Sequence, residues 1–276
     1  MIPRSPDAAA WRRLPNDGAD LTESIHHRST ALAAGFPDAV IGTRPILYLI
    51  MAALDACWGR AFHEGGWVEY RNRAPIFEAD EVRAALDPAP AGTARLEVVT
   101  ADGRRCVDGA AGLGGDPPWL GREREREPDG GGILPEWVTG TTLARSVERF
   151  DAPEPLFLPL CHRQEWYTGA SPWGPPIVAP AKLQVHAVLA VADRIAAMFG
   201  SWSRLAIIGL GFHSRAPLSV GERYDVHAGA AGKGVAGRHP YFEIGADVSA
   251  SGALRQAIRV RVAHLAAPGG SGGTSR

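Results

Sequence analysis

Two long segments of the chain are apolar over nearly their whole length. The first runs from Arg44 to Phe62 as RPILYLIMAALDACWGRAF, and the second runs from Ala179 to Phe199 as APAKLQVHAVLAVADRIAAMF. Runs this long, with so few polar positions, predict α-helices that are buried over most of their surface. Neither helix can face water, so we expect a sheet to wrap around each one.

Segments with alternating apolar and polar positions follow each predicted helix. After the first helix, GWVEYRNRAPIFEADEVRAAL contains two such runs, broken at Pro75. TARLEVVTADGRRCVDGAAGL then predicts a hairpin with its turn at Asp102-Gly103. After the second helix come LAIIGLGFHSRAPLSVGERYDVHAGA and HPYFEIGADVSASGALRQAIRVRVAHL, the latter with a turn near Ser251-Gly252. Both halves therefore predict a buried helix followed by antiparallel strands.

The two halves also share sequence. NRAPIFEADEVRA, from Asn72 to Ala84, matches SRAPLSVGERYDV, from Ser214 to Val226. One helix with a curled antiparallel sheet, present twice, explains this repeat and predicts an α+β protein. We divide the chain into five parts: an N-terminal extension (1–20), a first unit (21–114), a linker rich in Pro, Gly and charge (115–140), a second unit (141–266) and a Gly/Ser-rich tail (267–276).

With this order of elements, the chain resembles the MaoC-like, double-hotdog family, which includes (R)-specific 2-enoyl-CoA hydratases. The stretch RAPL-x-VGE after the second helix is similar to the family's RPL-x-VGD feature. The resemblance covers almost the whole chain outside the linker and the tail. It implies a double hotdog, in which two antiparallel sheets each wrap a long central helix and an acyl tunnel forms between the units. The fold hosts hydratases, dehydratases, thioesterases and inactive partners, so it does not by itself assign an activity.

Composition excludes several classes of function. The 276 residues are 45% hydrophobic and 21% charged, which is typical of a globular protein. A net charge of −1 gives no basic field for nucleic acid. The three cysteines are too few and too scattered for a disulfide framework or a metal site. The sequence contains no apolar run of membrane-spanning length and no signal-peptide core. We therefore expect a soluble, cytoplasmic protein without metal, cofactor, nucleic-acid or membrane partner.

The stretch LCHRQEWYTGASPWGPPIVAP, from Leu160 to Pro180, precedes the second helix. The resemblance aligns it with the family's catalytic loop, which reads S-G-D-x-N-P-hydrophobic-H. In that register His162, Gln164 and Tyr167 stand where relatives carry Asp, Asn and His, and they are the predicted catalytic residues. His162 would act as the base, because imidazole titrates near neutral pH, and Tyr167 as the proton donor. The alternative is that His162 is an ordinary loop residue and Tyr167 a packing aromatic.

The start of the second helix is the predicted site for the substrate carbonyl. In the hydratases a backbone N–H at this position polarises the thioester. Here the family's glycine is replaced by Pro180, which has no N–H, so Ala181 or Lys182 would donate instead. Lys182 could also bind an anionic group or simply be solvated, and His186 shares its helix face. The predicted substrate-binding residues are Ala181, Lys182, His186, Trp166 and Trp173.

Asp55 supports a rival hypothesis. It lies within the first apolar helix, and hotdog thioesterases place a water-activating carboxylate on this helix. A buried acid needs a partner and often indicates function, although a surface position near the helix end would explain it equally well. His63 and Glu64, in FHEGG, are typical of a helix C-terminal turn.

Together these features favour a lyase that hydrates or dehydrates an acyl thioester, carried by CoA or a carrier protein, or a related small carbonyl compound. A diverged cyclase or isomerase of a specialised biosynthetic pathway is the first alternative. A non-catalytic acyl-binding partner and a thioesterase are further alternatives. A homodimer is compatible with the sequence.

Overall fold

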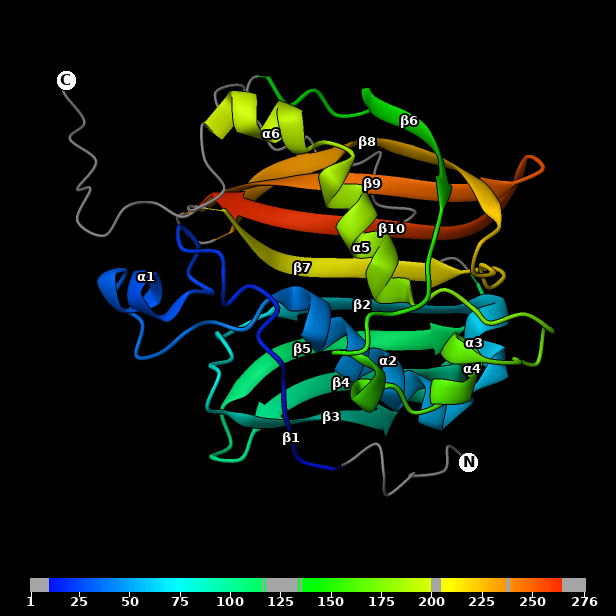
Figure 1. Ribbon diagram of the computed structural model, residues 1–276, viewed down its shortest axis with the longest axis horizontal. Helices are drawn as coiled ribbons and strands as arrows, with labels where there is room; N and C mark the ends of the chain where they lie inside the picture. The colour runs from blue at the N-terminus through cyan, green and yellow to red at the C-terminus, as the bar shows by residue number, and fades with distance from the viewer. Residues whose placement is uncertain are drawn as a thin grey trace.

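The computed structural model describes residues 10–115, 117, 134, 136–199, 205–236 and 239–264. Ten strands form one antiparallel sheet in the order β1-β3-β4-β5-β2-β7-β10-β9-β8-β6 (Figure 1). The strands are β1 (Arg12–Arg13), β2 (Gly66–Asn72), β3 (Glu81–Pro88), β4 (Thr93–Thr100), β5 (Arg105–Leu113), β6 (Thr142–Arg149), β7 (Leu205–Ser214), β8 (Arg223–Ala236), β9 (His239–Ala250) and β10 (Ala253–His264). The helices are α1 (Arg28–Ala33), α2 (Thr43–Trp58), α3 (Arg60–Gly65), α4 (Gln164–Thr168), α5 (Pro180–Leu189) and α6 (Ala192–Phe199), with short 3₁₀ turns η2 (Pro90–Gly92) and η4 (Leu158–Leu160).

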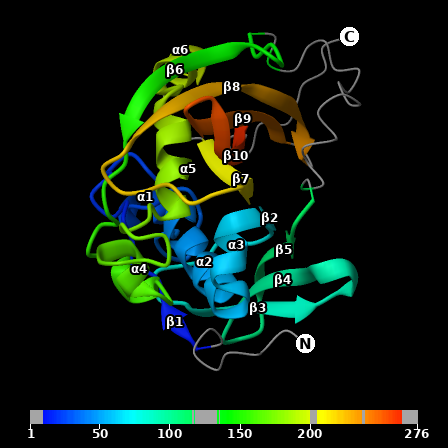
Figure 2. The ribbon, with the colours of Figure 1, turned by 90° about the vertical axis from the view of Figure 1, so that its right-hand side faces the viewer.

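The two predicted sheets are the halves of this one sheet. Strands β2 to β5 belong to the first unit and β6 to β10 to the second, and β1 of the N-terminal extension lies at the edge of the first half. They join where β2 pairs with β7, from Trp67 opposite His213 to Arg71 opposite Gly209. Figure 2 shows α2 and α5 on the same face of the sheet. The two helices also contact each other, so the hydrophobic core is continuous across both units.

The first predicted helix is confirmed, with an earlier end. Helix α2 is buried at every position from Pro45 to Asp55, as its apolar sequence requires. It ends at Trp58 because Gly59 has a φ of 49°, a left-handed value that glycine adopts without strain. The chain then restarts as α3. Helix α2 and the short helix α3, with a bend between them, thus replace the single predicted helix.

The second predicted helix is broken into α5 and α6. The Val191 amide donates to the Val188 carbonyl, a short i→i−3 turn that ends α5. Helix α6 buries only Ile195, whereas Asp193 and Arg194 are exposed. Because α6 carries a polar face, it diverges from α5 rather than continuing under the sheet (Figure 1). The prediction of one long buried helix over Ala179–Phe199 was wrong at this point.

Both predicted hairpin turns are present. Gly103 in the β4–β5 turn has a φ of 87°, and Ser251 and Gly252 between β9 and β10 have φ values of 51° and 79°. Two successive positive φ values belong to a tight hairpin turn of the primed type.

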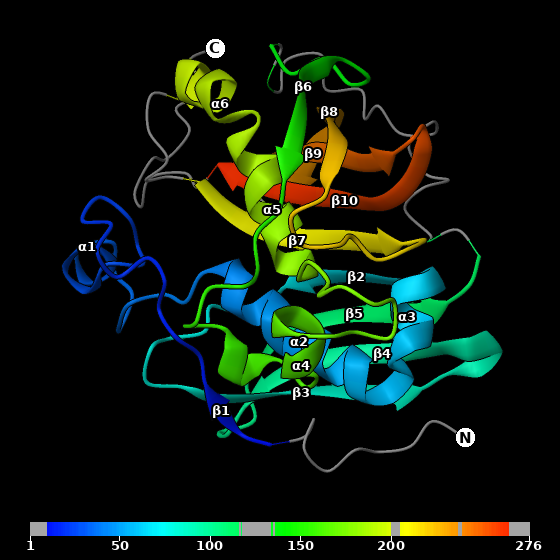
Figure 3. The same cartoon turned by 45° about the vertical axis from the view of Figure 1, so that its right-hand side comes forward.

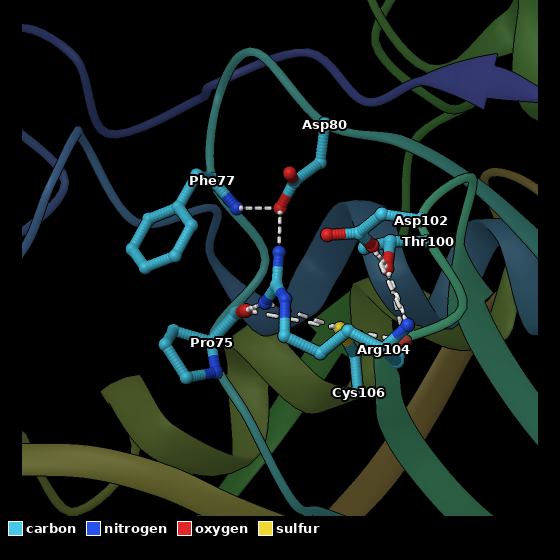
Figure 4. A network of polar contacts seen from close by, with 7 residues as sticks. All are labelled: Pro75, Phe77, Asp80, Thr100, Asp102, Arg104 and Cys106. Carbon is cyan, nitrogen blue, oxygen red and sulfur yellow. Dashed lines mark hydrogen bonds and ion pairs between the residues drawn. The ribbon is translucent and has the colours of Figure 1, made fainter.

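The break at Pro75 is a loop that an arginine holds against the sheet (Figure 4). Nη2 of Arg104 lies 2.6 Å from Oδ2 of Asp80, and the same oxygen accepts the Phe77 amide at 2.7 Å. Arg104 also donates to the Pro75 carbonyl. The guanidinium therefore satisfies one carbonyl of this irregular segment and holds the carboxylate that accepts the Phe77 amide.

The internal repeat is visible in the hydrogen bonds. The amides of Arg73 and Ala74 both donate to the Cys106 carbonyl, at 2.7 and 3.3 Å. In the second unit the equivalent residues of the RAP sequence, Arg215 and Ala216, both donate to Arg255, at 2.8 and 3.1 Å. In both units, therefore, two successive amides share one carbonyl just after a strand, which is β2 in the first unit and β7 in the second.

A second pair of hydrogen bonds fixes the start of each central helix. The Ile41 amide donates to the Ile76 carbonyl, and the Val178 amide donates to the Leu218 carbonyl, both at 2.8 Å. Ile76 and Leu218 follow the proline in the two RAP sequences. The matched sequences therefore have the same role in each unit.

The N-terminal extension forms an edge of the sheet, because β1 pairs with β3 through Arg12 opposite Val82. Most of the predicted linker over 115–140 and the whole predicted tail over 267–276 lie outside the described residues. Across the part of the chain that the structure describes, the helices are too short or too polar to cross a membrane.

Candidate functional site

The loop singled out by the sequence crosses to the other unit. It belongs to the second unit by sequence, yet α4 lies against α2 and α3 of the first unit (Figure 3). Two side-chain contacts hold it there. The Tyr167 hydroxyl donates to Asp55 at 2.8 Å, and the Trp173 indole donates to Glu64 at 2.9 Å. The candidate site therefore combines both units.

Asp55 is the centre of a buried polar triad. Nε2 of His63 lies 2.8 Å from Oδ1 of Asp55, and the Tyr167 hydroxyl donates to Oδ2. Asp55 and Tyr167 are each 2% exposed, and His63 is fully buried. Both carboxylate oxygens thus have a hydrogen-bond donor, which is what a buried carboxylate requires.

The bend after α2 explains how His63 reaches Asp55. Asp55 lies in the last turn of α2, and its carbonyl accepts the Gly59 amide at 2.9 Å. The left-handed Gly59 turns the chain, so that α3 carries His63 back over the end of α2. The Ser214 hydroxyl donates to the His63 carbonyl at 2.6 Å and ties this turn to β7.

Aromatic rings surround the imidazole of His63. Its centroid lies 5.8 Å from that of Trp166, 5.4 Å from that of Trp173 and 6.5 Å from that of Tyr167, all in edge-on arrangements. Nδ1 is buried and has no hydrogen-bond partner among the described residues. We assign the proton of the neutral ring to Nε2, because that nitrogen faces the carboxylate. Nδ1 then carries a lone pair that points in a fixed direction, which suits this nitrogen to act as a general base.

The groups next to the triad keep their protons. Burial, reinforced by the negative charge of Asp55, raises the pKa of Tyr167 well above its ordinary value. Burial and then Asp55 raise the pKa of the Cys161 thiol to about 12. Tyr167 is therefore a hydrogen-bond donor, and Cys161 is not a thiolate nucleophile at neutral pH.

The predicted pair of His162 and Tyr167 is not joined by a hydrogen bond in the structure. His162 is half-buried and has no side-chain hydrogen bond within the described residues, and Gln164 is exposed. Tyr167, predicted as the proton donor, instead donates its hydroxyl hydrogen bond to Asp55. Trp166 and Trp173 both border the triad.

The other predicted substrate-binding residues lie at the start of α5. The Lys182 amide donates to Ala179 at 2.9 Å, and its Nζ lies 2.9 Å from Oε1 of Glu154. The Lys182 N–H is therefore already engaged within the helix start, and its charge is already paired. Ala181 is fully buried. His186 packs edge-on against Phe150 at 4.7 Å.

His63 was not among the residues predicted for the site. The stretch FHEGG predicted the end of a helix, and α3 does end at Gly65. A signal was nevertheless present. Asp55 on an apolar helix needs a partner, and His63 is the next histidine along the chain.

Comparisons with known proteins support the fold. Neither a family model nor a curated protein matches the chain. A solved structure of a conserved hypothetical protein from Mycobacterium tuberculosis, described as a double hotdog, has a TM-score of 0.59 and 15% identity, and the match covers 93% of this chain and 94% of that one.

Two further structures have different described activities. A protein described as a MaoC domain dehydratase, from Chloroflexus aurantiacus, gives a TM-score of 0.54 at 11% identity, with 94% of both chains covered. A protein described as an oleoyl thioesterase, from Lactobacillus plantarum, gives 0.51 at 11% identity, with 94% of this chain and 96% of that chain covered. At such identities the likeness concerns the fold alone: the chain has the double-hotdog fold that MaoC-like dehydratases and thioesterases share.

Proposed function

We propose that the protein is a lyase of the hydratase and dehydratase type that acts on a small acyl thioester, with Asp55 and His63 as its acid–base pair. One observation carries the proposal. His63 is held by Asp55 through Nε2, while its other ring nitrogen, Nδ1, has no partner among the described residues. An imidazole oriented by a carboxylate, with one free lone pair, is suited to moving a proton to and from substrate.

In the hydration direction, Nδ1 of His63 takes a proton from water. The water oxygen forms a bond to the β-carbon of the enoyl thioester, and the electron pair of the double bond moves onto the carbonyl oxygen as an enolate. The imidazolium then returns its proton to the α-carbon, which gives the β-hydroxyacyl thioester. Dehydration is the reverse. Asp55 remains ionised throughout, and it stabilises the imidazolium in the same way as the carboxylate of other His–Asp pairs.

Tyr167 is a positioning residue in this mechanism. Its hydroxyl occupies Oδ2 of Asp55, so that Oδ1 alone faces His63. This role differs from the proton donor predicted from the sequence, because Tyr167 acts through Asp55 rather than on substrate. His162 has no role in this mechanism, and its replacement therefore provides a control.

A thioesterase is the second candidate, because the fold is shared with a protein described as an oleoyl thioesterase. In that reaction Asp55 would itself activate water. Both of its oxygens accept hydrogen bonds, from His63 and Tyr167, so this role requires one of those bonds to break. The geometry thus favours His63 as the base.

The substrate reaches His63 only if the cover moves. The imidazole is fully buried, and the rings of the half-exposed Trp166 and Trp173 pack edge-on against it. Loops that close over active sites commonly exclude water in this way. The segment from α4 to Trp173 is therefore the cover in this proposal.

Crotonyl-CoA and crotonyl-pantetheine test the proposal. The loss of absorbance of the conjugated enoyl thioester reports hydration, and the release of free thiol reports hydrolysis. We expect hydration by the wild type and a loss of about 10²- to 10⁴-fold in rate for His63→Gln, the contribution typical of an acid–base group. Asp55→Asn should lose activity as well, whereas His162→Ala should retain it.

Two results would overturn the assignment of Asp55 and His63 as the acid–base pair. One is full turnover by His63→Gln, and the other is loss of turnover by His162→Ala alone. Thiol release that requires Asp55 but not His63 would instead support the thioesterase.

A further inference from the structure

Tyr48 carries a second buried polar atom, on the same helix as Asp55. It lies on α2 seven residues before Asp55, so the two side chains share one face of the helix, two turns apart. Its ring is 2% exposed, and its hydroxyl has no hydrogen-bond partner among the described residues. Tyr48 lies beside the segment that leads to Tyr167, because its ring stacks on Phe157, whose carbonyl accepts the Cys161 thiol at 3.8 Å.

Packing holds the ring of Tyr48 in place, although its hydroxyl has no hydrogen-bond partner among the described residues. It stacks on Phe157 with centroids 4.8 Å apart and the planes 8° from parallel. The guanidinium of Arg44 lies 4.6 Å from the centroid of the same phenylalanine. Arg44 is in turn held by Asp17 at 2.7 Å and by Glu154 at 3.3 Å. A packed arrangement thus directs a donor that no described protein group accepts.

A buried hydroxyl without a partner is costly. Leaving such a group unsatisfied destabilises a fold by about 1–3 kcal/mol, and phenylalanine would fill the same space without that penalty. A ligand atom that accepts the hydrogen bond is one explanation of the tyrosine. Tyr70 shows why position matters, because its hydroxyl is also buried and unpartnered. However, Tyr70 lies on β2, whereas Tyr48 lies on the helix that carries Asp55.

The two unpartnered polar atoms, Nδ1 of His63 and the hydroxyl of Tyr48, are complementary. Nδ1 of His63 accepts a hydrogen bond, and the Tyr48 hydroxyl donates one. An acyl thioester undergoing hydration needs both functions, because a proton leaves the water while negative charge develops on the carbonyl oxygen. The amide of Lys182, an oxyanion donor that the sequence suggested, is already bonded to Ala179.

We propose that Tyr48 is a further catalytic residue, whose hydroxyl donates a hydrogen bond to the thioester carbonyl oxygen and stabilises the enolate. This inference rests on the proposed function, because it places the same substrate beside His63. The hydroxyl keeps its proton throughout, so no bond is broken. Burial, with the charges of Glu154 and Cys161, keeps the pKa of Tyr48 above its usual value, which is consistent with that role.

The first experiment compares Tyr48→Phe with Tyr70→Phe, since both variants remove a buried hydroxyl without a partner. We expect Tyr48→Phe to reduce kcat on crotonyl-CoA by about 10²- to 10³-fold, the loss typical of one oxyanion donor, with little change in KM. Tyr70→Phe should retain the wild-type kcat. Thermal unfolding of both variants shows whether they are folded.

The second experiment measures the polarisation of the substrate carbonyl directly. Butyryl-CoA labelled with ¹³C at the carbonyl is saturated, so it cannot be hydrated, and infrared difference spectra report the polarisation of its C=O bond. We expect a lowered stretching frequency on the wild type and on His63→Gln, and a return toward the solution frequency on Tyr48→Phe.

The outcomes separate this inference from the proposed function. An unchanged kcat in Tyr48→Phe, or a carbonyl band that does not depend on Tyr48, overturns the role of Tyr48. Full activity of His63→Gln together with a Tyr48-dependent band overturns the acid–base assignment and leaves the carbonyl site standing.

Discussion

The indole nitrogen of Trp173 lies 2.9 Å from Oε1 of Glu64, the residue that follows His63 in the chain. The same carboxylate oxygen accepts Nε of Arg60 at 2.6 Å. Hydrogen bonds from Arg60 and then from Trp173 hold the pKa of Glu64 below its usual value. The outer end of the loop is therefore fastened beside the buried histidine by an exposed contact, which is weak enough to break and re-form.

Trp173→Phe should loosen this loop. The variant keeps an aromatic ring but cannot donate to Glu64, so local opening should increase a few-fold. Hydrogen exchange at the Ile177 amide, which donates to the Trp166 carbonyl, measures the opening. Trp11→Phe, at an exposed tryptophan near the N-terminus, is the control. Equal exchange at Ile177 in all three proteins would contradict the expectation.

Tyr167→Phe should destabilise the protein by about 1–3 kcal/mol, because it leaves Oδ2 of Asp55 buried without a donor. Urea unfolding measures the difference. Tyr70→Phe should not destabilise the protein, since the hydroxyl that it removes has no partner among the described residues. Equal stabilities of the two variants would show that the Tyr167–Asp55 hydrogen bond contributes nothing.

The cysteines should react with thiol reagents in a definite order. Cys57 is half-exposed. Burial raises the pKa of all three thiols, to about 11 for Cys106 and to about 12 for Cys161. At pH 8 only about one in 10³ and one in 10⁴ of the latter two thiols would be ionised, and the thiolate is the reactive form. We expect one rapid modification, at Cys57, and two more after unfolding. Peptide mapping identifies the sites, and early labelling of Cys161 would argue against its burial.

Gly109→Ala should prevent stable folding. A Cβ at this position on β5 would lie 2.2 Å from the Glu69 carbonyl oxygen on β2, and two paired strands cannot separate without losing their hydrogen bonds. Gly65→Ala is the matched control, because a Cβ there meets nothing within 4 Å. Circular dichroism and soluble yield should separate the two variants, and a well-folded Gly109→Ala would mean that the pairing of β2 with β5 is wrong.

Lowering the pH should reduce the stability of the protein, because the half-buried His186 becomes protonated. Burial lowers the pKa of His186; Lys182 lowers it further, whereas Glu148 and Asp151 raise it. The folded pKa lies below the unfolded value of about 6.5, so this contribution to stability is present above about pH 6.5 and is lost as the pH falls through the folded pKa.

His186→Gln should therefore flatten the loss of stability between about pH 7 and pH 5, the range in which histidine titrates. The exposed His227 supplies the control variant, His227→Gln. Urea midpoints across this range measure the slope, and the same slope in wild type and His186→Gln would refute the assignment.

Local signals in the sequence were sufficient for most of the fold. The burial of α2, the turns at Gly103 and Gly252 and the repeated RAP sequences each depend on a few neighbouring residues. The break between α5 and α6 was missed. The segment is apolar on average, and only the position of Asp193 and Arg194 relative to Ile195 shows that one side faces out.

The site was harder to predict because its contacts are long-range. Tyr167 and Asp55 are 112 residues apart, and nothing near either residue indicates the other. The resemblance to a catalytic loop directed attention to Tyr167 and His162 within one segment. The tertiary structure instead pairs Tyr167 with a carboxylate on the other unit and leaves His162 without a side-chain hydrogen bond in the described residues.

The repeat of the two units has a consequence for stoichiometry. Ile41 and Val178 are equivalent residues just before the two central helices. Asp55 lies as far after Ile41 as Ala192 lies after Val178, and Tyr167 lies as far before Val178 as Thr30 lies before Ile41. The scaffold is therefore present twice, but the carboxylate and the phenol are each present once. A chain of two similar halves should bind one acyl ligand, and titration should give a ratio of one ligand per polypeptide rather than two.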